Sequence, residues 1–242
     1  MHSLFLYGLF SPYFFFDRYY IIYVLPALAL AMIAQFNVQS TFSRYSRVPN
    51  SHGLTGADVA RRILDQNGLY SVRVERVGGK LSDHYDPRDR VVRLSEEVYE
   101  GHSVASLGVA AHETGHAIQH STAYTPLSLR NAIIPVTQFS SSASIWILLI
   151  GFIFNWRPLV FAGIILFSFA VVFQIITLPV EFNASARALK ILGGSGILYG
   201  EELNGAKKVL TAAALTYVAA TVVAFAQLIR LIAIFGGSRD DG

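Results

Sequence analysis

Cysteine is absent from this sequence of 242 residues, and charged residues are scarce. Without cysteine the chain can form no disulfide bond and offers no thiolate to a metal, so a bound metal must be held by His, Asp or Glu. Charged residues make up 14% of the chain, whereas soluble domains have about 25%, and 53% of the residues are hydrophobic. This composition indicates a chain that lies largely in lipid.

Four apolar stretches are long enough to cross a bilayer, whose hydrocarbon core of about 30 Å requires about 20 helical residues. We expect spanning helices at residues 20–36, 133–154, 158–180 and 210–235. The polar first half of the second stretch is predicted to face other helices. The aromatic segment 1–19 favours a position at the membrane interface over a cleaved signal peptide, because no basic cluster precedes the apolar run.

Basic residues near these predicted spans are distributed unevenly between the two sides of the membrane. The side that holds residues 37–132 and 181–209 has seven, and the other side has three. The seven are Arg44, Arg47, Arg130, Arg187, Lys190, Lys207 and Lys208, and the three are Arg18, Arg157 and Arg239. Cytoplasmic loops carry an excess of basic residues, so the first side is expected in the cytoplasm. Anionic lipid accounts for this basic character, and no motif predicts a nucleic-acid partner.

Residues 37–132 are predicted to form a small α+β domain on that side. Thr55 and Asp58 have the spacing of a capping box, which opens a helix that Asn67 and Gly68 close. Strands are expected at 70–74, 80–85 and 90–94, and further helices after Ser95 and Ser103. A few strands beside a metal-bearing helix are typical of a zincin. The predicted fold class is therefore a helical multi-pass membrane protein with a small zincin-like α+β domain.

The residues His112, Glu113 and His116 form an H-E-x-x-H motif within a predicted helix. A helix advances about 3.6 residues per turn, so both imidazoles lie on one face and can reach one ion. The carboxylate of Glu113 lies beside them, where it can accept a proton from a water that the metal activates. Two core histidines satisfied by hydrogen bonds are the alternative reading, but an apolar helix has little reason to hold these three residues without a metal.

A zinc hydrolase usually has three protein ligands, so a third one must come from elsewhere in the chain. His120 lies about 12 Å along a straight helix from His112 and would need a helix break to take part. Glu181 is the better candidate, because it stands at the cytoplasmic end of a charge-free span where a carboxylate needs a partner. A solvated helix-end glutamate is the alternative for Glu181, and His84 and His102 stay open as ligands. Ser185, one turn after Glu181, is placed to orient a ligand.

Three segments resemble the YugP-like neutral zinc metallopeptidases of bacterial membranes. They are S-D-H-Y-D-P at 82–87, A-A-H-E-T-G-H-A-I-Q-H at 110–120 and L-P-V-E-F-N-A-S at 178–185. The chain is more distantly similar to the membrane gluzincins. This resemblance implies His112, His116 and Glu181 as ligands of one Zn²⁺ per chain, Glu113 as the general base, and a place in the inner (plasma) membrane of a bacterium. Those relatives usually have Asp where this chain has Ser185, so the groups around the ligands are expected to differ.

The predicted function is that of a membrane zinc metalloendopeptidase whose substrates are membrane or membrane-proximal proteins. His84 and Tyr85 are candidate catalytic residues on a predicted edge strand, and Arg187 is a further candidate near the ligands. The expected partners are the lipid bilayer and a protein or peptide substrate, and small residues in the last span allow a homo-oligomer or a membrane partner protein. A noncatalytic scaffold stabilised by zinc is the alternative. Glu113 favours the enzyme, because structural zinc does not need that carboxylate.

Overall fold

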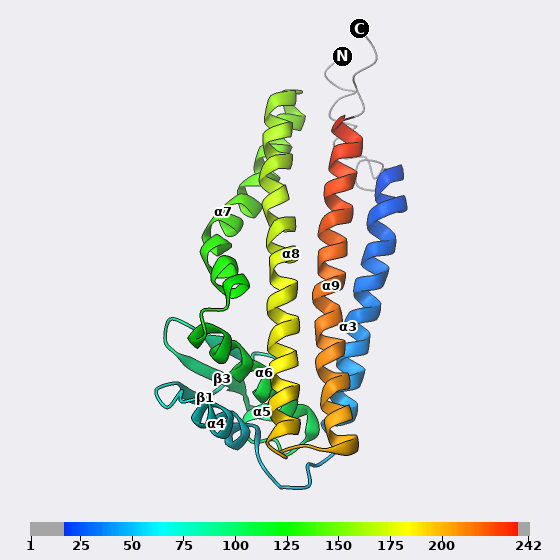
Figure 1. Cartoon of the computed structure of the whole chain (residues 1–242). Helices are drawn as coiled ribbons and strands as arrows, with labels where there is room; N and C mark the ends of the chain where they lie inside the picture. The colour runs from blue at the N-terminus through cyan, green and yellow to red at the C-terminus, as the bar shows by residue number, and fades with distance from the viewer. Residues whose placement is uncertain (1–16, 237–242) are drawn as a thin grey trace. The chain divides into compact units, whose positions relative to one another are not determined.

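The computed structural model describes residues 17–236, so most of the predicted interfacial segment 1–19 lies outside the described residues. The elements are as follows, in chain order. They are η1 (Tyr20–Val24), α3 (Leu25–Tyr45), α4 (Gly56–Gln66), β1 (Arg73–Val77), β2 (His84–Asp86), β3 (Val91–Ser95), α5 (Glu96–Tyr99), α6 (Val104–Ser121), α7 (Thr125–Ile153), α8 (Arg157–Gly194) and α9 (Gly200–Gly236) (Figure 1). The fold is mostly helical with one small sheet, as the sequence predicts.

The chain divides into two compact units. Unit 1 comprises Met1–Ile33, Ala132–Ile175 and Val218–Gly242, and unit 2 comprises Ala34–Asn131 and Ile176–Tyr217. Apart from Asp17 and the turn at 154–156, the described part of unit 1 is helical, whereas unit 2 also contains the sheet. The helices α3, α7, α8 and α9 each contribute residues to both units.

Four helices are long and apolar enough to cross a membrane. They comprise Tyr20–Tyr45, Thr125–Ile153, Arg157–Gly194 and Gly200–Gly236, with mean hydropathies between 1.6 and 2.7 in their most apolar windows. Each extends beyond the apolar run seen in the sequence, because the flanking polar residues continue the helix. Large apolar side chains on them are exposed, for example Phe36 at 74%. Such exposure suits lipid as the surrounding solvent.

Proline lies inside two of these helices. Pro135 is in α7 and Pro179 is in α8. Proline has no N–H, so the carbonyl four residues earlier receives no helical hydrogen bond from it. These carbonyls belong to Asn131 and Ile175. Asn131 is the last residue of a segment of unit 2, and Ile175 is the last residue of a segment of unit 1, so the chain passes from one unit to the other at both places.

The sheet of unit 2 has three strands in the order β1-β3-β2. The central strand β3 pairs in parallel with β1 and antiparallel with β2, so β2 is an edge strand. The buried residues Val91, Val92 and Leu94 show that β3 is covered on both faces. The strand predicted at 70–74 begins later in the structure, at Arg73, because Tyr70 and Ser71 form a turn after α4.

The predicted capping box of α4 is confirmed. The hydroxyl of Thr55 accepts a hydrogen bond from the backbone N–H of Asp58 at 3.0 Å, and the Asp58 carboxylate accepts one from the backbone N–H of Thr55 at 2.9 Å. Two otherwise unpaired N–H groups are satisfied, so the first turn of α4 is fixed.

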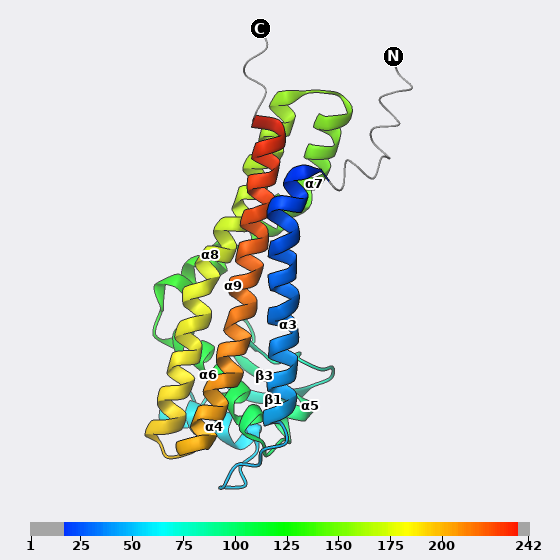
Figure 2. The ribbon, with the colours of Figure 1, turned by 90° about the vertical axis from the view of Figure 1, so that its right-hand side faces the viewer.

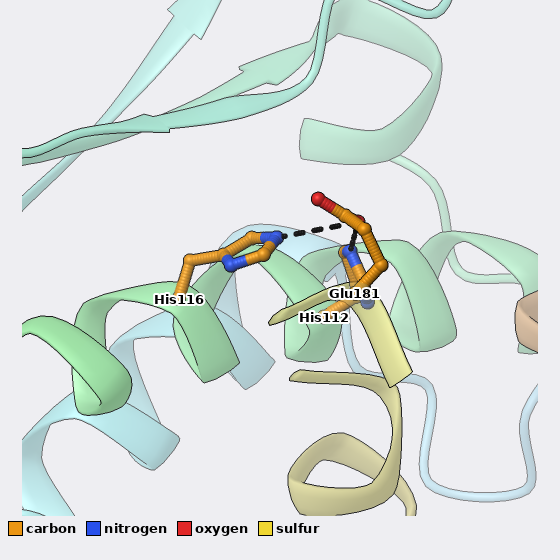
Figure 3. A group of neighbouring side chains, drawn as sticks. All are labelled: His112, His116 and Glu181. Carbon is orange, nitrogen blue, oxygen red and sulfur yellow. Dashed lines mark ion pairs between the residues drawn. The ribbon is translucent and has the colours of Figure 1, made fainter. Parts of the chain in front are cut away.

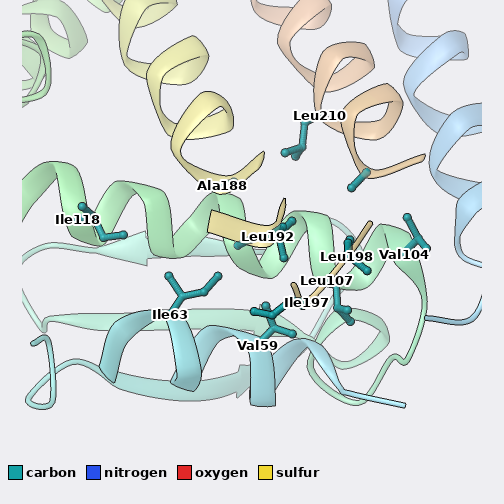
Figure 4. Packing of buried hydrophobic residues seen from close by; sticks show 12 residues of the cluster. Val59, Ile63, Val104, Leu107, Ile118, Ala188, Leu192, Ile197, Leu198 and Leu210 are labelled. Carbon is teal, nitrogen blue, oxygen red and sulfur yellow. The ribbon is translucent and has the colours of Figure 1, made fainter. Parts of the chain in front are cut away.

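The core of unit 2 is built around α6. Figure 4 shows that side chains of α4 lie against one part of α6, and side chains of α8, α9 and their connection lie against another. The buried cluster consists of Val59, Ile63, Val104, Leu107, Ala111, Ile118, Ala188, Leu192, Ile197, Leu198, Ala206 and Leu210. Because helices on different sides hold α6, it cannot rotate without opening this core.

The capping box predicts a specific dependence of stability on pH. Hydrogen bonds from the backbone and side chain of Thr55 lower the pKa of Asp58. A depressed carboxyl pKa stabilises the fold above the unfolded value of about 4, and this contribution is lost as pH falls through the lower folded value. Asp58→Asn should therefore reduce the free energy of unfolding by about 1 kcal/mol at neutral pH, and less in acid.

Thermal unfolding in detergent between pH 3 and 7 measures this difference. Asp65→Asn on the same helix controls for the loss of a surface carboxylate, since Asp65 is paired with Arg61 on the solvent side. A wild-type advantage over Asp58→Asn that stays constant across this pH range would contradict the prediction.

Candidate metal centre

Two histidine side chains of α6 lie one turn apart and converge. The rings of His112 and His116 have centroids 4.7 Å apart and are nearly perpendicular, with an interplanar angle of 86°. The helix runs without a break to Ser121, so His120 stays on the same straight axis. Its Nδ1 instead lies 2.8 Å from the Tyr85 hydroxyl. The sequence left His120 open as a ligand, and the structure does not bring it to this pair.

Glu181 joins the two histidines from a different helix. Its Oε2 atom, on α8, lies 3.3 Å from Nε2 of His112 and 3.7 Å from Nε2 of His116 (Figure 3). One ligand atom from each residue can be chosen so that all three lie within 4.8 Å of one another. Among the described residues these three form the group of His, Asp and Glu side chains that could hold a metal ion.

A glycine allows α8 to come this close to α6. A Cβ atom added at Gly115 would lie 2.8 Å from the backbone oxygen of Ala184, closer than carbon atoms approach such oxygens. Gly115 is one of the two variable positions in the H-E-x-x-H motif, and Ala184 is three residues after Glu181. The missing side chain at Gly115 therefore permits the backbone contact that brings Glu181 to the histidines.

The geometry of these residues fits zinc. A tetrahedral ion with ligands at about 2.1 Å separates the ligand atoms by about 3.4 Å, close to the distances of 3.3 and 3.7 Å from Glu181 to the two imidazoles. Glu181 is only 3% exposed, and its Oε2 atom accepts no hydrogen bond within the described part of the chain. A buried carboxylate oxygen is costly without a partner, and a cation would provide one. Two imidazoles and a carboxylate are also a common donor set of catalytic zinc.

The second nitrogen of each histidine is held in place. Nδ1 of His112 lies 3.1 Å from the hydroxyl of Ser185, and Nδ1 of His116 lies 2.9 Å from Oε1 of Gln119. With Nε2 free for a metal, each Nδ1 carries the proton and donates it to that oxygen. Ser185, which the sequence suggests as a residue that could orient a ligand, thus lies against His112.

Gln119 also connects α6 to α8. Its side chain is fully buried, and its Nε2 donates to the backbone oxygen of Val180 at 2.8 Å and to Oδ1 of Asn183 at 3.0 Å. Arg187 donates to the same Asn183 oxygen at 2.8 Å and lies over the ring of Tyr124. Arg187 thus reaches the histidines only through Asn183 and Gln119.

Arg130 is a functional residue that the sequence analysis missed, because it was counted only as a basic charge beside a span. Its Nη1 lies 3.1 Å from Oε1 of Glu181. The guanidinium thereby holds one oxygen of the carboxylate and leaves the other facing the histidines. The sequence does indicate that a carboxylate at the position of Glu181 needs a partner. Spacing along the chain cannot identify that partner, because Arg130 is 51 residues away.

Glu113 lies beside the histidines with its carboxylate unengaged. It is 9% exposed and makes no hydrogen bond or ion pair with the residues that the structure describes. Burial disfavours the charged form of His116, but the nearby negative charges of Glu181 and Glu113 outweigh this effect and raise the pKa of His116. The site therefore attracts positive charge, either as a proton or as a metal cation.

Two cavities meet at these side chains. A cavity of about 160 Å³ is lined by His84, Tyr85, Arg130 and both metal-site histidines, and one of about 720 Å³ is lined by His112, Glu113 and Glu181. Tyr217 of α9 lines both and was also missed by the sequence analysis. The structure thus brings His84 and Tyr85 to the smaller cavity.

The other histidines are engaged elsewhere. Nδ1 of His84 lies 2.7 Å from the backbone oxygen of Ser82, and Nδ1 of His102 lies 2.9 Å from that of Gly53. Neither belongs to the group that could hold a metal within the described residues. The geometry therefore favours Glu181 over the two histidines that the sequence left open.

Comparisons with known proteins show what the chain as a whole is similar to. A family model described as "Putative neutral zinc metallopeptidase" matches residues 20–236. The chain is 53% identical over 222 residues to the "Putative membrane protease YugP" of Bacillus subtilis (strain 168), covering 92% of this chain and 99% of the relative. No solved structure matches the chain.

The close approach of α6 and α8 predicts the effect of one added methyl group. Gly115→Ala should push the Ala184 backbone away and separate Glu181 from the histidines. We expect zinc affinity to fall by about tenfold or more, the loss that is typical when groups positioning metal ligands are disturbed.

Competition with a chelating zinc indicator, on protein in detergent, measures the affinity. Gly108→Ala is the matched control on the same helix, since its added Cβ would meet Ala206 only at an ordinary contact distance of 3.5 Å. Equal zinc affinity of Gly115→Ala and Gly108→Ala would show that the backbone contact does not position the ligand.

Proposed function

Because the chain belongs to the family of neutral zinc metallopeptidases, we propose that it is a membrane zinc metalloendopeptidase with His112, His116 and Glu181 as the ligands of one Zn²⁺ per chain. The observation that carries this proposal is the convergence of two Nε2 atoms and one buried carboxylate oxygen beside an unengaged glutamate. A zinc site that only stabilises the fold does not need Glu113 next to its ligands.

Glu113 acts as the general base. Zinc held at this site would polarise the peptide carbonyl and lower the pKa of a bound water toward about 7. Glu113 takes a proton from the attacking water and transfers it to the leaving amine. Within residues 17–236 no donor is seen to engage its carboxylate, and this supports the role, because a carboxylate that is not already engaged is the better proton acceptor.

Several side chains are placed to stabilise the developing negative charge on the carbonyl oxygen. His84 lines the smaller cavity beside Glu113; because its Nδ1 donates to the backbone oxygen of Ser82, its Nε2 can donate to the oxyanion only when the imidazole carries both protons. The hydroxyl of Tyr85 faces His120 instead, so we favour His84 of these two. Tyr217 lines both cavities and is a further candidate donor. The edge strand β2 also offers backbone groups on which an extended substrate can pair.

The site is proposed to lie on the cytoplasmic side of a bacterial inner membrane. The proposed spans are 20–36, 133–154, 158–180 and 210–235, with a zincin-like cytoplasmic domain at 37–132 and a second cytoplasmic segment at 181–209. The excess of basic residues beside the spans on that side supports this orientation. Glu181 then stands next to the end of a span, so membrane and membrane-proximal proteins are the proposed substrates.

The absence of cysteine makes the proposed orientation directly testable. Ser71→Cys lies in an exposed turn of the proposed cytoplasmic domain, and Trp156→Cys lies in the exposed turn between α7 and α8. A membrane-impermeant maleimide should label Trp156→Cys in intact cells and Ser71→Cys only after the membrane is opened. Labelling of Ser71→Cys in intact cells would place the metal site on the opposite side.

The peptidase mechanism predicts different effects of two substitutions. Glu181→Ala removes a ligand and should lose zinc, whereas Glu113→Gln keeps the zinc but removes the proton acceptor. We expect Glu113→Gln to lower cleavage by a factor of about 10² to 10⁴, the usual contribution of a general base. Metal analysis and cleavage of a panel of membrane-protein substrates, with protein in detergent, measure both effects.

Glu201→Gln, at an exposed position at the start of α9, is the control and should retain zinc and activity. If wild type holds zinc but cuts no substrate differently from Glu113→Gln, the zinc-stabilised scaffold replaces the enzyme as the explanation. If Glu181→Ala keeps its zinc, the third ligand is a different residue.

A further inference from the structure

We propose that the larger cavity beside the metal centre binds apolar side chains of the substrate next to the scissile bond, and that Ala213 and Ala214 of α9 set the size of side chain it accepts. This inference rests on the proposed peptidase function and specifies its substrates. They are polypeptides with a large apolar residue, such as Leu or Phe, on one side of the cleaved bond.

The position of the cavity connects it to the reaction. Its volume is about 720 Å³, and its lining includes His112, Glu113 and Glu181. A substrate whose carbonyl lies at the metal centre therefore places a neighbouring side chain at the mouth of this cavity. The cavity lies entirely within unit 2, so its walls belong to one compact part of the chain.

The walls are helices packed closely side by side. The parts of α3 and α9 in unit 2 are adjacent in both views of the molecule (Figures 1 and 2). A Cβ added at Gly205 of α9 would lie 2.7 Å from the ring of Tyr45 at the end of α3. This close packing fixes the two helices at one end of the cavity, so its shape is largely formed before a substrate binds.

The lining is mostly apolar. It includes Val38 and Phe42 of α3, Val109 of α6, and Val209, Leu210, Ala213 and Ala214 of α9. Charged side chains of both signs also line it, namely Arg47 and Lys80 with Asp83 and Glu97. Away from Glu113 and Glu181 at the candidate metal centre, these two cations face two carboxylates, so that part of the lining has no net charge. Removal of apolar surface from water is therefore the main favourable contribution of this cavity to the free energy of substrate binding.

The second cavity at the metal centre has a different character. It measures about 160 Å³ and is lined by His84, Arg130 and Asn131 among others. The larger cavity, at about 720 Å³ against about 160 Å³, is therefore the one with room for large side chains and for the residues around them. The two sides of the scissile bond thus meet different surroundings, with a large apolar residue favoured on one side and a small or polar residue on the other.

Two alanines leave space in the larger cavity. Ala213 is half-buried and Ala214 is 5% exposed, and both lie on the face of α9 toward the cavity. A larger side chain at Ala213 would occupy the volume that a substrate residue needs. Leu215 is 44% exposed, does not line this cavity and lies on the same helix, so Leu215→Phe is a matched control.

The test uses zinc-loaded full-length protein in detergent and internally quenched peptides that differ only in the residues flanking the cleaved bond. Wild type should cleave peptides with Leu or Phe on one side about 10- to 100-fold faster, in kcat/KM, than peptides with Ala or Glu there. Ala213→Phe should lose this preference while it keeps its zinc and still cleaves the Ala peptide. Leu215→Phe should retain the wild-type preference.

The inference is overturned if wild type cleaves the Leu, Ala and Glu peptides equally well, or if Ala213→Phe keeps the preference with its zinc in place. If Ala213→Phe does not fold, Ala213→Val and the cavity-enlarging Val209→Ala replace it. Ala213→Val should shift the preference toward smaller residues, and Val209→Ala toward larger ones. Unchanged preferences in both variants also overturn the inference.

A binding measurement separates this inference from the peptidase function. Fluorescence anisotropy with labelled peptides and the Glu113→Gln protein reports binding without cleavage. Wild type that cleaves no peptide would contradict the peptidase function. The cavity assignment still stands in that case if Glu113→Gln binds the Phe peptide more tightly than the Glu peptide and the additional Ala213→Phe change removes this difference. Equal binding of both peptides overturns the cavity assignment.

Discussion

The backbone contact between α6 and α8 at Gly115 is the constraint on which the metal centre depends. The two histidines come from one helix and would lie on one face of it in any fold. The third donor comes from a helix 65 residues later in the chain (181 − 116 = 65) and is in place only because the two backbones meet. Burial of the apolar cluster on α4, α6, α8 and α9 stabilises the packing of these helices against one another. Packing of apolar side chains thus determines the distance between polar ones.

The charges at the candidate metal centre explain how these polar side chains can be buried. Glu113 and Glu181 carry two negative charges, and Arg130 compensates one of them. The remaining negative charge requires a proton on an imidazole or a metal cation. A zinc ion bound at the proposed site would therefore compete with protons for the same nitrogens, as metals do wherever imidazole is a ligand. Gln119 and Ser185 keep these nitrogens oriented in either state.

The sequence predicts the local parts of this structure well. The spacing of His112, Glu113 and His116, the capping box of α4 and the apolar runs depend on neighbours along the chain, and the helices that they predict are present. The strand expected at 70–74 begins only at Arg73. Tyr70 fits the alternation of apolar and polar residues that predicts a strand, but Tyr70 and Ser71 form a turn. Arg130, Gln119 and Tyr217 could not be assigned, since their partners are set by how α7, α8 and α9 pack. Glu181 was the exception, because a lone carboxylate at the end of an apolar span needs a partner.

The two prolines have a mechanical consequence. Pro135 and Pro179 each remove one helical hydrogen bond at the border of unit 2, from the carbonyl of Asn131 next to Arg130 in α7 and from that of Ile175, six residues before Glu181, in α8. Helices bend most easily where such a bond is missing. When bilayer thickness or lateral pressure changes, α7 and α8 can flex at these joints instead of transmitting the strain. Arg130 and Glu181 both belong to unit 2, so bending at these joints would leave their ion pair in place while the spans adapt to the lipid.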